Sequence, residues 1–194
     1  MTEIGNMEMS SESDTCIWLL ADDGMFSVGT TRRFIDARLL PSLVPSTAWE
    51  KMLPRKVNIF LWRLILDRLP HRLNLSSRGM EIQEISCPSC HGSVESNHHI
   101  FFDCDIARSI WRLVRVWCDI SMPQFGSNDD WRDWLSSWSA SLAKKQRILT
   151  IIVSSLWVIW RYRNSVIFSS HSMRKSDIFD SIRLFSFSWL KLIG

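Results

Sequence analysis

The chain has 194 residues, of which 46% are hydrophobic and 22% charged, and its formal net charge is +3. This composition is typical of one globular domain or one and a half, and it excludes a collagen-like or low-complexity chain. The N-terminal sequence is polar and acidic, without the basic and apolar regions of a secretory signal. We therefore expect an intracellular protein, in the cytoplasm or the nucleus, and not a secreted one.

The first part of the chain is predicted to hold little regular structure. Residues 1–14 read as a disordered acidic lead-in. Within residues 15–45, Asp23 and Gly24 lie between two short apolar runs, a pattern that predicts a β-hairpin. A short helix then reaches Arg38.

Residues 46–120 are predicted to form a separate domain built on two helices. Apolar side chains recur at three- and four-residue spacing over residues 55–69, which predicts an amphipathic helix. A second helix reaches Cys118 and is predicted to be capped by Asp103 or Asp105.

Between these helices, four residues follow the pattern Cys-x2-Cys-x8-His-x4-Cys: Cys87, Cys90, His99 and Cys104. Three thiolates and one imidazole can enclose Zn2+ tetrahedrally with no open position, so we expect one structural zinc ion and no catalytic one. A redox role for Cys-x2-Cys is disfavoured because the chain shows no βαβ pattern beside it. Disulfides are disfavoured because the number of cysteines, five, is odd. His98 and His91 are alternative ligands, but His99 is preferred because three apolar residues follow it directly. Cys118 is expected in the core.

The last segment, residues 121–194, is predicted to be a helical region after a polar connector. Helical patterns cover residues 130–138, 142–168 and 176–192. The apolar-rich run 148–160 is shorter than the ~20 residues that cross a bilayer, so a buried helix is expected and no membrane partner. Six tryptophans on helical patterns are predicted to lie in the core: Trp49, Trp62, Trp111, Trp117, Trp157 and Trp160.

Charge is distributed unevenly, with seven basic residues in 47–80 and seven in 142–176. Basic segments on both sides of a zinc cluster favour a nucleic-acid partner, although solvated helix faces explain the charge alone equally well. The residues expected to face phosphates are Lys51, Arg55, Lys56, Arg63, Arg108, Arg112 and Arg115.

Several ordered motifs carry a family resemblance: Trp49-Glu50-Lys51, Pro54 to Arg63, Asp67 to Pro70, Asn74-Leu75 with Arg78-Gly79, Cys87 to Cys90, Glu95-Ser96, His99 to Cys104, Ala107 with Trp111, and Trp157 with Trp160-Arg161-x-Arg163-Asn164. Together they resemble the zinc-binding region that follows the reverse transcriptase in plant non-LTR (LINE-type) retrotransposons. Two departures are His71, where the family usually has threonine, and Cys16, where it often has tryptophan.

The resemblance implies a mainly α fold, with a small Cys3His zinc loop and a short N-terminal hairpin. It implies an accessory domain that binds RNA or DNA, and a reverse transcriptase domain of a related element as a second partner. The chain has no Tyr/Phe-x-Asp-Asp motif, so we expect no enzyme activity. The alternatives are a zinc-stabilised protein-interaction domain and an inert retrotransposon remnant.

Overall fold

A computed structural model of the chain describes residues 16–21, 23–39, 49–128, 130–171 and 173–191. The chain divides into two compact units, residues 1–47 and 48–194. The expected lead-in at 1–14 lies outside the described residues. The predicted boundary at residue 121 falls inside the second unit and stays a prediction.

The described part of the first unit contains one helix and one turn. Helix α1 spans Val28–Leu39. Before it, the amide of Trp18 donates to the carbonyl of Gly24 at 2.8 Å, and Gly24 has a φ of +67°. The predicted turn is present, but residues 16–21 and 23–27 form no paired strands. A two-stranded hairpin is marginal in water without a third strand or a packed face.

The second unit is helical. Its elements in chain order are α2 (Arg55–Ile65), α3 (Arg72–Ser77), the π-helical turn η1 (His99–Asp103), α4 (Asp105–Cys118), α5 (Asp130–Ser137), α6 (Leu142–Phe168) and α7 (Asp177–Leu190). An isolated antiparallel bridge joins Ser86 to Val94. The predicted fold class, mainly α with a Cys3His loop, is confirmed.

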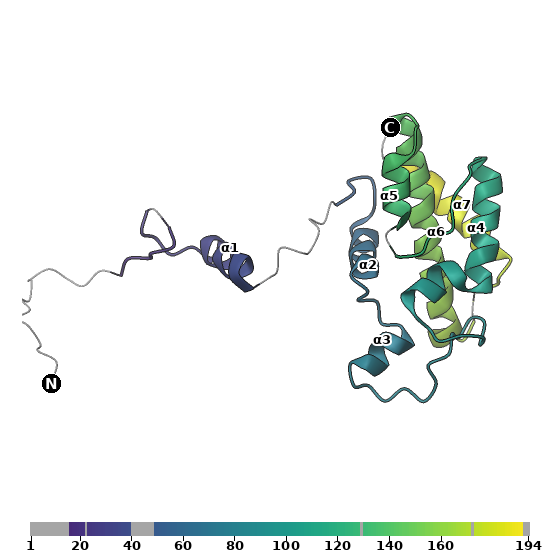
Figure 1. The fold of residues 1–194 in the computed structure, drawn as a ribbon, viewed down its shortest axis with the longest axis horizontal. Coiled ribbons are helices and arrows are strands. Elements are labelled where there is room, and N and C mark those ends of the chain that lie inside the picture. The colour runs from purple at the N-terminus through teal and green to yellow at the C-terminus, as the bar shows by residue number, and fades with distance from the viewer. Residues whose placement is uncertain (1–15, 22, 40–48, 129, 172, 192–194) are drawn as a thin grey trace, which may run out of the picture. The chain divides into compact units, whose positions relative to one another are not determined.

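Helix α6 is the centre of this unit, and Figure 1 shows α2 and α4 on either side of it. It contacts α2, α4, α5, α7 and η1. Ile152, Val153 and Leu156 are fully buried, as expected for a helix that is apolar around most of its circumference. Among the described residues, no helix is long and apolar enough to cross a membrane.

Two predicted helix boundaries are wrong. The helix expected over 55–69 ends at Ile65, because Asp67 adopts a left-handed φ of 49° and Arg68 donates its amide back to Arg63 at 2.7 Å. Helix α4 begins after Cys104 and has no side-chain cap, so neither expected aspartate caps it.

The tryptophan prediction is correct in part. Trp111 and Trp160 are buried, with 7% and 8% of their surface exposed, and Trp62, Trp117 and Trp157 are half-buried. The prediction is wrong for Trp49, which lies before α2 and is 55% exposed. The most buried tryptophan is Trp131 in α5, which was not predicted.

Candidate metal centre and nucleic-acid interface

The first half of the zinc loop is a tight turn that directs two cysteines to one side. The amide of Cys87 donates to Ser93 at 2.7 Å, and the amide of His91 donates to the carbonyl of Cys87 at 2.8 Å. His91 completes the turn with a left-handed φ of 56°. The amide of Gly92 also reaches the sulfur of Cys90 at 3.5 Å. Backbone hydrogen bonds therefore set the Cys-x2-Cys geometry.

The second half of the loop is the π-helical turn η1. Its first residue, His99, donates its amide to the hydroxyl of Ser96 at 3.1 Å. The amide of Cys104 then donates to the carbonyl of His99 at 2.8 Å. Ile100 and Phe101 lie between these ligands and are buried, 3% and 0% exposed. The apolar run after the histidine thus anchors the turn in the core, as its sequence predicted.

The structure brings together the four predicted ligands, Cys87, Cys90, His99 and Cys104, whose ligand atoms all lie within 4.8 Å of one another. The sulfur of Cys90 lies 3.2 Å from Nε2 of His99. Two sulfurs bound to one zinc at about 2.3 Å would lie roughly 3.8 Å apart in a tetrahedron, so small shifts suffice to bind the ion. These residues form one Zn2+ site, and its four protein ligands leave no position for substrate.

The thiols of Cys87 and Cys104 share one proton, so their pKa values move in opposite directions. The thiol of Cys104 hydrogen-bonds to Cys87 and lowers the pKa of Cys87 to about 4, against the opposing effect of burial. The same contact, together with burial, raises the pKa of Cys104. A bound zinc ion deprotonates coordinating thiols outright, so it would replace this shared proton. Cys118 lies elsewhere, half-buried against the core and not within it as expected, and burial raises its pKa to about 11.

The alternative histidines have other roles. Nε2 of His98 lies 3.2 Å from a carboxylate oxygen of Asp103 and outside the ligand group. His91 is exposed in the turn. The geometry therefore agrees with the choice of His99.

Comparison with known proteins identifies the segment that contains this site. Residues 26–111 match the family described as zinc-binding in reverse transcriptase. The resemblance to a zinc-binding region of reverse transcriptases is confirmed for these residues. No curated protein and no solved structure matches the chain. The match begins in the first unit and ends at Trp111, within α4, so most of the helical core lies beyond it.

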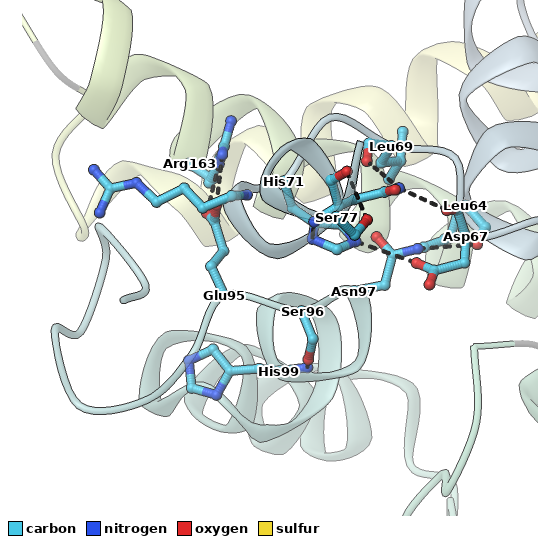
Figure 2. A network of polar contacts seen from close by, with 12 residues as sticks. Leu64, Asp67, Leu69, His71, Ser77, Glu95, Ser96, Asn97, His99 and Arg163 are labelled. Atoms are coloured by element: carbon cyan, nitrogen blue, oxygen red, sulfur yellow. Dashed lines mark hydrogen bonds and ion pairs between the residues drawn. The ribbon is translucent and has the colours of Figure 1, made fainter. Parts of the chain in front are cut away.

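A buried ion pair joins the zinc-binding segment to that core. Glu95 is 0% exposed, and Arg163 of α6 donates to both of its carboxylate oxygens, from Nε and an Nη, at 2.6 Å each (Figure 2). The amide of Arg72, at the start of α3, donates to the same carboxylate at 2.7 Å. The ring of Trp160 lies 4.9 Å from the guanidinium carbon. One carboxylate thus holds α3, the zinc loop and α6 together.

Two further polar residues complete this support, both visible in Figure 2. His71 replaces the threonine usual in the family, and its Nδ1 accepts from the amide of Asn74 at 3.1 Å, so the altered residue still caps α3. The side-chain amide of Asn97 donates from Nδ2 to the carbonyl of Leu64 at 3.2 Å, at the end of α2. The loop before His99 is therefore tied to the core by hydrogen bonds.

The predicted cationic residues fall in two places. Arg108, Arg112 and Arg115 follow one face of α4, directly after the ligand Cys104. The others lie in or next to α2: Lys51, Arg55, Lys56 and Arg63. Among the described helices, α2 and α4 each contact α6 and not each other. The two groups of cations therefore lie on helices that do not pack against each other. Contact of these residues with nucleic acid stays a prediction.

Sequence reasoning missed two features of this region. Glu95 and Arg163 were noted as motif residues but not as partners, because nothing local links residues 68 positions apart. The connector after α4 was read as polar, yet it buries Met122 and Phe125, at 6% and 8% exposed. Met122 and Phe125, two large apolar residues in a polar stretch, were the sequence signal from which this burial could have been predicted.

Proposed function

We propose that this chain is a zinc-structured accessory domain that binds nucleic acid through the arginine row of α4: Arg108, Arg112 and Arg115. The observation that carries the proposal is the position of this row. It begins four residues after Cys104, which is both a zinc ligand and the first residue before the helix. Zinc would therefore fix where these cations point. The name of the matching family, zinc-binding in reverse transcriptase, supports a nucleic-acid context.

The arginine row is suited to phosphates rather than to internal ion pairs. Arg112 is exposed, and no acidic partner is recorded for it among the described residues. Arg115 reaches a backbone carbonyl, that of Trp111, at 3.4 Å. Arg108 shares Asp103 with His98, at 3.5 Å. Exposed guanidinium groups bind phosphate oxygens through charge and paired hydrogen bonds, largely independently of sequence.

We further propose that the chain alone has no polymerase activity. The saturated donor set leaves zinc no open position, and the carboxylate of Asp130 is engaged in local hydrogen bonds. Asp130 accepts amide hydrogen bonds from Gly126 at 2.7 Å and Ser127 at 2.9 Å. The hydroxyl of Ser127 and these amides hold the pKa of Asp130 below its usual range. Primer extension on an RNA template by the purified chain, lost on mutation within it, would contradict this.

The test is binding at several salt concentrations. Fluorescence anisotropy of the purified zinc-loaded chain with single-stranded RNA, single-stranded DNA and duplex DNA should show affinity that falls with salt. Four to six phosphate contacts on a single strand give a log–log slope of roughly −3 to −4, at about −0.7 per contact. Changing the three α4 arginines to Gln should flatten this slope by about 2.

A matched control separates local contacts from net charge. Arg174, Lys175 and Arg183 are exposed cations at and near the start of α7, away from α4's arginine row in sequence. Changing these three to Gln removes the same charge and should leave the slope nearly unchanged. Equal effects of the two triple variants would mean nonspecific attraction, and no salt-dependent binding would reject the proposal.

One observation favours a protein-interaction domain as the second candidate. Leu113 and Val116 of α4 are 41% and 77% exposed, and Leu184 and Phe187 of the contacting helix α7 are 65% and 53% exposed. Exposed apolar residues on two contacting helices are typical of an interaction surface. This function would be favoured if the wild-type chain bound no nucleic acid but formed a complex with another protein, and if Val116→Glu abolished that complex.

A further inference from the structure

A groove of about 600 Å³ lies along α4, beside the connector residues 122–126. Its volume falls in the range of sites that bind small organic groups. Apolar rings line one part of it and arginines another. The lining residues used below are Phe102, Trp111 and Phe125, then Arg108, Arg112 and Arg115, with His98, Asp103 and Gln124.

The apolar part of the groove is a preformed cluster of aromatic rings. Phe102 stacks on Trp111 with 6.0 Å between ring centroids and 11° between planes. Phe125 meets both rings edge-on, at 5.8 and 6.4 Å. The indole N–H of Trp111 donates to the carbonyl of Phe101 at 2.7 Å, which fixes the ring and satisfies its polar atom. The three side chains are 8%, 7% and 8% exposed, so what they offer a ligand is a narrow apolar edge at the groove.

The polar part of the groove carries an excess of positive charge. Three arginines line it, against the single carboxylate of Asp103. That carboxylate already lies 3.5 Å from Arg108 and 3.2 Å from His98, so it is engaged within the protein. Arg112 and Arg115 have no recorded acidic partner in the described part of the chain. An anionic ligand complements this rim.

Two uncommitted polar groups belong to residues that line the groove, His98 and Gln124. Nδ1 of His98 is buried and has no hydrogen-bond partner among the described atoms. When Nε2 carries the proton towards Asp103, Nδ1 is an acceptor. Gln124 is exposed and adds an amide that can donate and accept. A ligand with hydrogen-bonding groups on the edge of a flat ring matches this arrangement.

We propose that the groove receives the base of one unpaired nucleotide of a single-stranded nucleic acid, while the flanking phosphates lie on the arginine row. The inference rests on the proposed function and adds the part of the strand that is recognised. From Arg108 to Arg115 the row extends about 10 Å along the helix axis, comparable with roughly three nucleotides of a strand. A base in a duplex stays paired and stacked, so duplex DNA would contact only the rim.

The sharpest test changes the ligand and leaves the protein intact. Affinity is measured for a single-stranded oligonucleotide and for the same backbone with abasic positions, over the same series of salt concentrations. The intact strand should bind about fivefold or more tightly than the abasic strand, because base–aromatic contacts add to phosphate contacts. The salt slopes of the two strands should be the same, since their phosphates are unchanged.

A protein variant then locates the effect. Changing Phe125 to Ala removes one wall of the groove without removing a cation and should bring the ratio of the two affinities close to one. Phe179, a half-buried phenylalanine that contacts Trp117 outside the groove, provides the matched control, and Phe179→Ala should keep the ratio. Because each ratio is measured on one protein, a general loss of stability does not imitate the result.

The outcomes separate the two proposals. Equal, salt-dependent binding of intact and abasic strands would overturn the groove and leave phosphate binding standing. No binding of either strand would reject both. Duplex DNA bound as tightly as the intact single strand would also overturn the inference.

Discussion

The zinc loop of residues 86–104 and helix α6 hold their conformations by different means. In the loop, Glu95 and Asn97 are almost completely buried polar residues, held by hydrogen bonds, an ion pair and a metal site. In α6, the buried residues are mainly apolar and pack against four other helices and η1. Outside η1, whose apolar residues are buried, the loop depends on these cross-links, whereas α6 depends on burial throughout.

The largest test of this contrast is removal of zinc. Apparent zinc binding in small finger peptides is on the order of 10–16 kcal/mol, which matches or exceeds the ~5–15 kcal/mol stability of a whole domain. Chelation should therefore disorder the loop while α6 keeps much of its protection. Hydrogen exchange with and without chelator measures this.

The ligand assignment is tested by two variants. His99→Ala should lose zinc and His98→Ala should retain it, and the reverse result would reassign the ligand.

The next largest effect concerns the buried ion pair. Arg163→Ala leaves the carboxylate of Glu95 buried without its charged partner, and this should lower the free energy of unfolding by about 3–5 kcal/mol. The exposed pair of Arg174 and Asp177, at 2.8 Å, is the control, because water screens this pair and its loss should change the free energy of unfolding far less. Denaturant unfolding measures both. Equal costs would mean that the buried pair does not couple the loop to α6.

A change within α6 should act on stability without acting on metal directly. Ile152 is 0% exposed, so Ile152→Ala should lower the free energy of unfolding by about 2–5 kcal/mol through lost burial and a cavity. Zinc content at a temperature well below unfolding should stay at one ion per chain. Loss of zinc from the folded variant would show that the two regions are not separable.

The smallest effect on stability is expected for Asn58, a residue of α2 that hydrogen-bonds to the segment before the helix. Asn58 accepts from the amide of Glu50 and donates to the carbonyls of Glu50 and Leu53, at 3.0, 3.0 and 3.1 Å. Asn58→Ala leaves these groups without a side-chain partner and should cost about 1–3 kcal/mol. Ser109→Ala removes an exposed hydrogen bond within α4 and is the control. Thermal unfolding measures both variants, and a similar small change in each would contradict this role of Asn58.

The predictable part of this molecule is the part that depends on neighbours in sequence. The period of apolar residues gave α6 almost to the residue, and the spacing of cysteines gave the metal ligands. The predicted end of the second unit's first helix was wrong, because α2 ends before Asp67, whose left-handed conformation is not encoded in the period of apolar residues. The pair of Glu95 and Arg163 could not be predicted, since it depends on how α6 folds back over the loop.

The separation of 68 positions between Glu95 and Arg163 also orders events during synthesis. At about 5–20 residues per second, roughly 3–14 s separate the translation of the two partners. All four zinc ligands have been translated before Arg163 is added to the chain. Until then the carboxylate of Glu95 stays hydrated, because burying it alone would be costly. The nascent chain can thus acquire its metal first, and the loop reaches its final packing only when α6 arrives.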